Sequence, residues 1–233
     1  VINNLEHKRW FFLRANLNFL GTLFYIISLF YFRCITIQIT IIGLIPIINL
    51  LGNYILNAGT LTLTEGILAK GILGGNTVID GAINSTEAIA SAIDIRSEKS
   101  LTINANNILG AVANAGTLNL GAGTLSQSIT GTGTTVIDGT VTSNAAFTQG
   151  ALTVNTDKTL TASADNLNIS GSLINKGTLA TYGNLNNLTT LNNTNGTVKI
   201  ATEKELNVTN NYELDGGTLD LNGQTLNMQN AGS

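Results

Sequence analysis

The chain has 233 residues and a net charge of −3, with one His, one Cys, one Pro and one Trp. These counts exclude a Cys/His zinc site and a disulfide framework, and they leave His7 as the sole histidine for a Ser-His-Asp triad. The acidic balance argues against binding nucleic acid through a basic face.

The composition divides the chain near Gly52. Residues 1–51 hold nine of the thirteen aromatic side chains and have a net charge of +3, whereas residues 52–233 hold 23 of the 25 glycines and have a net charge of −6. A basic, apolar segment before an acidic body is typical of a membrane-inserting N-terminus followed by an exported region. We therefore predict a hydrophobic signal- or anchor-like segment over 1–51 and a repeat region over 52–233.

The first part opens with a basic cluster over residues 8–14, followed by a mostly apolar run over 15–32. That run is close to the shortest membrane span, so a signal peptide or a helical anchor is expected. A second apolar run, 35–51, is interpreted either as a continuation of this anchor or as strand-like sequence at the start of the body. A buried N-terminal cap and a spurious extension of the reading frame remain alternatives. His7 and Cys34 are interpreted as incidental.

Three motifs recur in the body at nearly the same long spacing. N-x-G-T-L at 57–61 returns at 114–118 and 175–179, with shorter Gly-Thr copies at 196–198 and 217–219. T-V-I-D-G at 77–81 returns at 135–139, and S-E-K-S-L-T at 97–102 returns as T-D-K-T-L-T at 156–161 and as T-E-K-E-L at 202–206. The offsets between the first two copies are 57, 58 and 59 for the three motifs, while the late Gly-Thr units are offset by 19 and 21. The long spacing therefore predicts three coils of about 20 residues each.

The body is predicted to be all-β. Stretches such as T-L-T-L and T-L-N-L alternate apolar and polar residues, and Asn-Gly, Asp-Gly and Gly-Gly dipeptides separate them. Such short strands cannot bury an apolar face alone, so we predict a β-solenoid of about nine coils with inward Leu, Val and Ile and outward Thr and Asn ladders. The stretch 87–95 is either a short helix or one more coil. The alternative architecture is a β-sandwich of short strands.

The repeats resemble the passenger regions of Gram-negative autotransporter surface antigens, in particular the rickettsial-type outer-membrane antigens. The resemblance rests on N-x-G-T-L-x-L at 57–63 and 114–120, D-K-T-L-T-A at 157–162 and N-K-G-T-L at 175–179. It implies a right-handed parallel β-helix that is exported to the cell surface and is associated with adhesion. The chain shows no outer-membrane barrel sequence and no clear signal-peptide cleavage site, so it is interpreted as a fragment of such an antigen.

Two acidic positions are candidates for chemistry. Asp80 and Asp138 occupy the same place in the two T-V-I-D-G copies, where a carboxylate could act catalytically or bind calcium. Each copy carries one carboxylate, so a turn aspartate before glycine is expected instead. Residues 216–220 have the broken spacing of a calcium-binding nonapeptide and are not expected to bind the ion.

Lysines recur beside acidic residues in the third motif. Lys99, Lys158 and Lys204 each follow Glu or Asp, and we predict a charge ladder along one corner of the solenoid. No catalytic, cofactor-binding or metal-binding residue is assigned, and no cofactor is expected. The aromatic side chains available in the body as sugar-stacking platforms are Tyr54, Phe147, Tyr182 and Tyr212.

The sequence favours a non-enzymatic, structural or adhesive protein exposed on the surface of a Gram-negative cell, with its first segment in the inner membrane. Its expected partners are a host-cell receptor or other surface-layer chains, and nucleic acid is excluded. Two alternatives stay open. One is a β-helix enzyme or binding module acting on polysaccharide, which the few aromatic residues disfavour. The other is the product of a truncated pseudogene without a function of its own.

Overall fold

The computed structural model describes residues 38–41, 54–56, 59–163, 167–224 and 226–228. Contacts divide the chain into two units, Val1–Ile37 and Gln38–Ser233, and the description concerns the second. The prediction of a signal or anchor segment, together with His7 and Cys34, lies outside the described residues. Within these residues, no helix has the length and apolar character needed to cross a bilayer.

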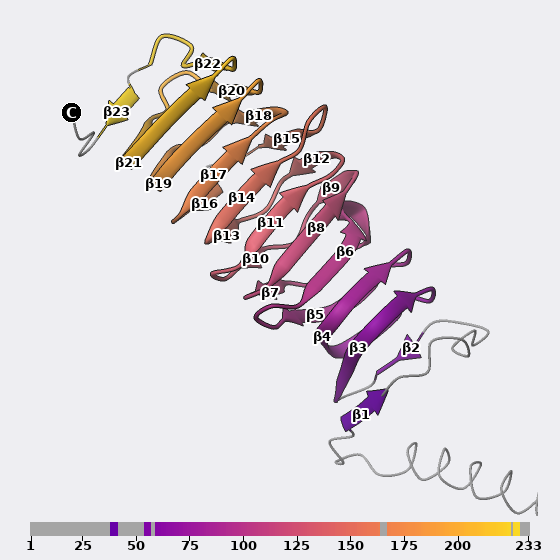
Figure 1. Cartoon of the computed structure of the whole chain (residues 1–233). Helices are drawn as coiled ribbons and strands as arrows, with labels where there is room; N and C mark the ends of the chain where they lie inside the picture. The colour runs from indigo at the N-terminus through magenta and orange to yellow at the C-terminus, as the bar shows by residue number, and fades with distance from the viewer. Residues whose placement is uncertain (1–37, 42–53, 57–58, 164–166, 225, 229–233) are drawn as a thin grey trace, which may run out of the picture. The chain divides into compact units, whose positions relative to one another are not determined.

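The second unit is a parallel β-solenoid of about nine turns, which confirms the predicted fold class (Figure 1). It contains one 3₁₀ turn, η1 (Ala105–Asn107), among the described residues. The strands in chain order are β1 Gln38–Ile41, β2 Tyr54–Ile55, β3 Thr60–Leu68, β4 Ile72–Ser85, β5 Ile89–Ile95, β6 Ser100–Asn104, β7 Val112–Asn114, β8 Thr117–Gly121, β9 Gly123–Leu125, β10 Ile129–Thr130, β11 Thr134–Ile137, β12 Thr140–Ser143, β13 Phe147–Gln149, β14 Ala151–Val154, β15 Thr159–Ala162, β16 Leu167–Ile169, β17 Ser172–Asn175, β18 Thr178–Thr181, β19 Leu185–Thr194, β20 Thr197–Ile200, β21 Leu206–Asp215, β22 Thr218–Asp220 and β23 Leu226–Met228.

Each central coil has three strands, and each strand pairs in parallel with its counterpart one coil away. The first strands are β7, β10, β13 and β16, the second strands are β8, β11, β14 and β17, and the third strands are β9, β12, β15 and β18. We call these three columns the first, second and third stacks. The number of residues between directly paired positions of adjacent coils, the register step, varies along the chain. Among the described strands it is among the smallest from Thr60 to Asn76 and largest from Gln38 to Thr60. These steps lie on either side of the predicted coil length of about 20 residues, which is therefore confirmed.

The first strand of this unit comes from the second apolar run of the N-terminal part. β1 pairs with β3 over four residues, from Gln38 opposite Thr60 to Ile41 opposite Leu63. These four residues therefore agree with the strand-like interpretation of that run. Of the two alternatives for 87–95, a short helix or one more coil, the structure has the coil. Its strand β5 buries Ile89, Ser91, Ile93 and Ile95.

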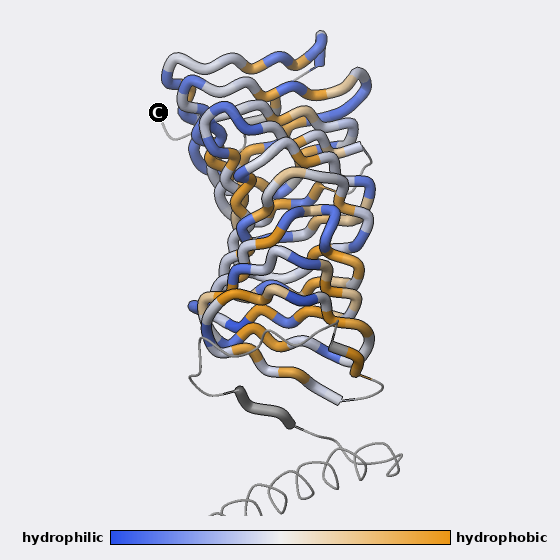
Figure 2. Tube along the Cα trace, turned by 90° about the vertical axis from the view of Figure 1, so that its right-hand side faces the viewer, coloured by the Kyte–Doolittle hydropathy of each residue, from blue (hydrophilic) through white to orange (hydrophobic). Residues whose placement is uncertain are grey.

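The core is a continuous column of aliphatic side chains, because equivalent strand positions stack with the same side inward. In the second stack one fully buried row runs through Leu101, Leu118, Thr135, Leu152, Leu173 and Leu191, so Thr135 is its one polar member. Figure 2 shows apolar and polar residues alternating along the coils. Each fully buried Leu contributes about 1.5–3 kcal/mol relative to exposure, so the rows supply most of the stabilisation.

A buried polar cluster joins Asn114 and Gln149 of the first stack to Thr135 of the second stack. The Asn114 side-chain amide donates to Gln149 Oε1 at 2.6 Å, and the Thr135 hydroxyl donates to the same oxygen at 3.0 Å. Asn114 and Gln149 are two coils apart, and Gly131, which has φ 130° and no side chain, lies between them. Gly131 therefore leaves room for two amides to meet inside the core, where an unpaired amide would be costly.

A second pair of buried amides lies in the second stack. Asn175 Nδ2 donates to Asn193 Oδ1 at 2.7 Å, and Asn193 Nδ2 donates to the Thr218 carbonyl at 2.9 Å. Both side chains are fully buried. The sequence analysis did not identify these amides, because they occupy inward positions of strands whose neighbours are Leu and Val.

The long-period repeat spans the predicted three coils and one further strand, so its copies do not stack in register. Leu61 of the first N-x-G-T-L copy lies in the first stack, Leu118 of the second copy in the second stack, and Leu179 of the third copy in the third stack. Three coils beyond Leu61 the register reaches Val112. The additional residues between copies thus carry each motif one strand further around the coil.

The acidic-Lys motif keeps its local structure at each corner. In the turn from Arg96 to Lys99, the Lys99 N–H donates to the Arg96 carbonyl at 3.1 Å and Glu98 has φ 63°. The turn from Asn155 to Lys158 repeats this bond, with Asp157 at φ 59°. The same sequence therefore builds the same turn at different places around the coil.

A glycine of the next coil covers each of these turns. A Cβ built at Gly116 would collide with the carbonyl oxygens of Arg96 and Lys99. A Cβ at Gly177 would collide with those of Asn155 and Lys158. The acidic-Lys turn and the N-x-G-T-L segment above it therefore form one two-coil module.

Candidate interaction face

The third stack carries a regular array of threonine side chains on its outer side. Directly paired positions give one row of five residues, namely Thr140, Thr159, Thr178, Thr197 and Thr218. Positions two residues further along the strands give a second row, namely Thr124, Thr142, Thr161, Ala180, Lys199 and Asp220. We call the eight threonines of these rows the threonine face.

The inward positions of the same strands explain why these threonines point outward. Val141, Leu160, Leu179 and Val198 alternate with them and are fully buried. Because the side-chain period of a strand is two, burying this apolar row fixes the Thr positions on the opposite side. Threonines in neighbouring strands are about 4.8 Å apart and those within one strand about 6.7 Å apart, so the hydroxyl groups form a lattice.

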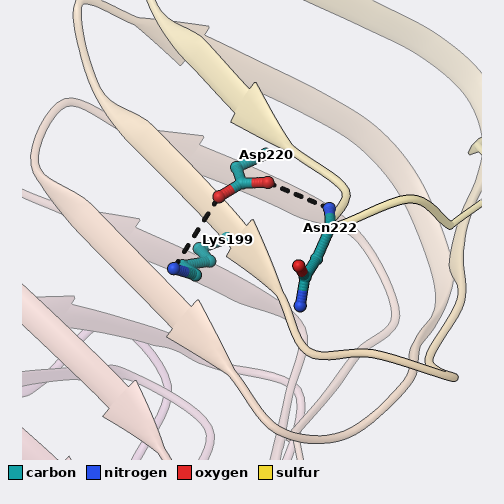
Figure 3. Close-up of polar contacts among 3 residues, drawn as sticks. All are labelled: Lys199, Asp220 and Asn222. Carbon is teal, nitrogen blue, oxygen red and sulfur yellow. Dashed lines mark hydrogen bonds and ion pairs between the residues drawn. The ribbon is translucent and has the colours of Figure 1, made fainter.

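The threonine face is uncharged until its C-terminal end. There Lys199 Nζ lies 3.8 Å from Asp220 Oδ2, and the Asn222 backbone N–H donates to Asp220 Oδ1 at 2.9 Å (Figure 3). Both ionised side chains are about half exposed, at 57% and 46%. Such a pair contributes about 0–1 kcal/mol, so its main effect is to end a neutral strip with local charge.

The outer side of the second stack is more mixed in chemistry. Its rows include Thr117 opposite Thr134, but also Val136, Ile174 and Glu213. Side chains also bond to each other along the axis: Asn119 Nδ2 donates to Thr102 Oγ1 at 3.2 Å, and Asn192 Nδ2 donates to Glu213 Oε2 at 2.6 Å. Each bond joins one pair of adjacent coils; the first is of the Thr-Asn kind predicted for outward ladders, whereas the second pairs Asn with Glu.

The structure does not bring the two candidate aspartates together. Asp80 follows the first-stack part of β4 and forms an ion pair with Arg96 at 3.1 Å. Asp138 follows β11 of the second stack and accepts from Asn155 Nδ2 at 3.3 Å. Their corners are different, and each carboxylate contacts the coil above. Asp80 lies within β4 and not in the expected turn, whereas Asp138 lies between β11 and β12, and each carboxylate joins one coil to the next.

The predicted charge ladder of lysines is wrong. Lys99, Lys158 and Lys204 precede Leu101, Leu160 and Leu206, which lie in the second, third and first stacks respectively. The three lysines therefore lie at three different corners and cannot stack. The shared sequence reflects the shared turn and not a shared row.

The described residues contain no group of three His, Cys, Asp or Glu side chains placed to hold a metal ion. Burial raises the pKa of Tyr212, whose hydroxyl has no hydrogen-bond partner among the described residues. Of the four aromatic candidates, Phe147 is 1% exposed and Tyr182 is 57% exposed. The structure describes the backbone of Tyr54 but not its side chain.

No family model, no curated protein and no solved structure matches this chain.

Proposed function

We propose that the chain is a surface-exposed, non-catalytic solenoid of the autotransporter-passenger type that acts by displaying its faces for adhesion. The observation that carries this proposal is the threonine face: five hydroxyl groups in one uninterrupted row and three in a parallel row that continues into Ala180, Lys199 and Asp220. A rigid lattice of hydroxyl groups loses little conformational entropy on binding, since β-branched side chains on a sheet are already restricted.

The rest of the solenoid supports a scaffold role. The aliphatic rows run from coil to coil, so stability depends on contacts between neighbours and the rod tolerates outward substitutions. Two ion pairs among the described residues, Asp80 with Arg96 and Asp220 with Lys199, each join adjacent coils. Adhesion would then come from faces and loops and not from a pocket.

Two experiments test the two halves of the proposal. Antibodies raised against the solenoid are expected to label intact, unpermeabilised cells of the source bacterium. Labelling that requires permeabilisation would contradict surface exposure. Beads coated with the full chain are expected to adhere to cultured host cells, and soluble chain is expected to compete.

A pair of matched variants tests the face itself. Thr159→Glu with Thr178→Lys places an opposite-charge pair across adjacent strands of the threonine face, and Thr117→Glu with Thr134→Lys does the same on the second stack. Opposite charges across a strand pair keep the sheet stable, so both variants should fold. Only the first is expected to lower adhesion, by about tenfold, equivalent to about 1.4 kcal/mol. Equal adhesion of both variants would rule out the threonine face.

A further inference from the structure

The chain contains two Asn-Gly dipeptides, and the structure places them in very different surroundings. Asn195-Gly196 and Asn222-Gly223 both have the asparagine in the left-handed region, with φ 55° and φ 51°. Asn-Gly is chemically labile because glycine lacks a Cβ that would hinder attack of its backbone nitrogen on the preceding side chain. Whether that attack happens depends on how freely the backbone can rotate.

The Asn222-Gly223 dipeptide lies in an exposed turn between β22 and β23. The turn is closed by one backbone bond, from the Gln224 N–H to the Leu221 carbonyl at 2.9 Å, and the Gln224 side chain donates to the Asn222 carbonyl at 3.3 Å. Nothing lies within 4 Å of the position that a Cβ on Gly223 would take. The side-chain amide of Asn222 is directed away from its backbone contact with Asp220 (Figure 3).

Asn195-Gly196 is held within the solenoid by bonds to a neighbouring coil. The Asn195 N–H donates to the Asp215 carbonyl at 2.8 Å, and the Gly196 carbonyl accepts from the Thr218 N–H at 2.7 Å. Gly196 is buried, and a Cβ there would lie 2.5 Å from Asn175 Nδ2. Rotation of this peptide would break bonds between coils.

We propose that Asn222 is a site of spontaneous covalent modification, at which the asparagine converts to aspartate and isoaspartate through a succinimide, whereas Asn195 keeps its amide. The Gly223 backbone nitrogen attacks Asn222 Cγ and forms a C–N bond. The bond from Cγ to Nδ2 breaks, and ammonia leaves with the proton from the Gly223 N–H. Water then opens the ring at either carbonyl, which gives aspartate or isoaspartate.

The product changes the charge at the end of the threonine face. A carboxylate at position 222 lies beside Asp220, which already accepts the Asn222 N–H and pairs with Lys199. Isoaspartate also adds a methylene group to the backbone of a turn that one backbone hydrogen bond closes. The modification is therefore expected to open the turn between β22 and β23 while the coils below it stay intact.

The test is a time course of the full chain in mildly alkaline buffer, followed by peptide mapping with fragmentation that separates aspartate from isoaspartate. Asn222 is expected to deamidate at least about tenfold faster than Asn195, because local opening of the exposed turn costs less free energy. In strong denaturant the two rates are expected to become similar, since both dipeptides then have the same freedom. Equal rates in the folded chain, or a ratio that denaturant leaves unchanged, would overturn the proposal.

A substitution provides the control for the site. Asn222→Gln lengthens the side chain so that the five-membered ring cannot form, and it is expected to remove the deamidation product from this peptide. Its solenoid is expected to keep the circular dichroism spectrum of the parent chain, because Asn222 is exposed. A deamidation signal of unchanged size in this variant would place the reaction at another residue and contradict the assignment.

Discussion

A substitution at Gly177 tests directly whether one coil packs closely on the next. A Cβ at this position would come within 3.0 Å of the carbonyl oxygens of Asn155 and Lys158, whereas ordinary contact begins at 3.4 Å. Both oxygens belong to the backbone of the turn below, so no side chain can rotate away. Gly177→Ala must therefore move the two coils apart at this corner.

Two hydrogen bonds between the coils flank the collision. The Thr178 N–H donates to the Lys158 carbonyl at 2.8 Å, and the Lys176 N–H donates to the Val154 carbonyl at 2.9 Å. Weakening both costs about 1–3 kcal/mol, and looser packing of the Leu179 row beneath adds about 1 kcal/mol. We expect Gly177→Ala to lower the free energy of unfolding by about 2–4 kcal/mol.

Urea unfolding followed by far-ultraviolet circular dichroism measures this change, with Lys176→Ala as the exposed neighbour control. The control is expected to stay within about 0.5 kcal/mol of the parent chain. Gly66→Ala separates the collision from backbone strain, because Gly66 has φ 112° but nothing within 4 Å of its Cβ position. If Gly177→Ala unfolds at the same urea concentration as Lys176→Ala, the proposed two-coil module does not hold the corner.

Three further predictions concern the core and its polar groups. Leu118→Ala is expected to cost about 2–5 kcal/mol in thermal or urea unfolding, whereas Leu109→Ala, at a side chain that is 51% exposed, should cost below about 1 kcal/mol. Gln149→Leu removes the acceptor that Thr135 uses, so we expect a loss of about 1–3 kcal/mol, and an equally stable variant would show that this bond contributes nothing. Burial raises the pKa of the Tyr212 hydroxyl above 10.0, so the unfolded chain loses this proton at a lower pH than the folded chain does. The free energy of unfolding should therefore fall as the pH rises beyond 10.0. Tyr212→Phe should make this fall smaller when unfolding is measured as a function of pH.

The alternation of apolar and polar residues predicted the strands, and the spacings of 19 and 21 between the late Gly-Thr units predicted the coil length. Short strands such as Thr159–Ala162 bury every second residue, and this signal is local to the sequence. The position of each motif around the coil could not be predicted in the same way. The register step from Thr60 to Asn76 is shorter than the step from Leu152 to Leu173, so a constant spacing between motifs does not define a whole number of turns.

The sequence predicted that outward positions would be rich in Thr, but it did not predict which stack would carry the threonine face. The T-x-T pattern at Thr140 and Thr142 indicates an outward pair, yet the same Gly-Thr signal at Thr60 and Thr117 belongs to other stacks. The charge ladder of lysines failed for the same reason. Buried amides such as Gln149 gave no sequence signal, because the partner that satisfies one comes from two coils away.

The shift of each motif by one strand per copy has a consequence for how such a protein grows. A chain lengthened by duplicating the unit between one N-x-G-T-L copy and the next would not line up its copies along one edge. Leu61, Leu118 and Leu179 instead lie in the first, second and third stacks, so successive copies rotate about the solenoid axis. In a longer solenoid each of the three sides would carry copies of the same motif. An antibody or ligand that recognises the motif could then bind from any side.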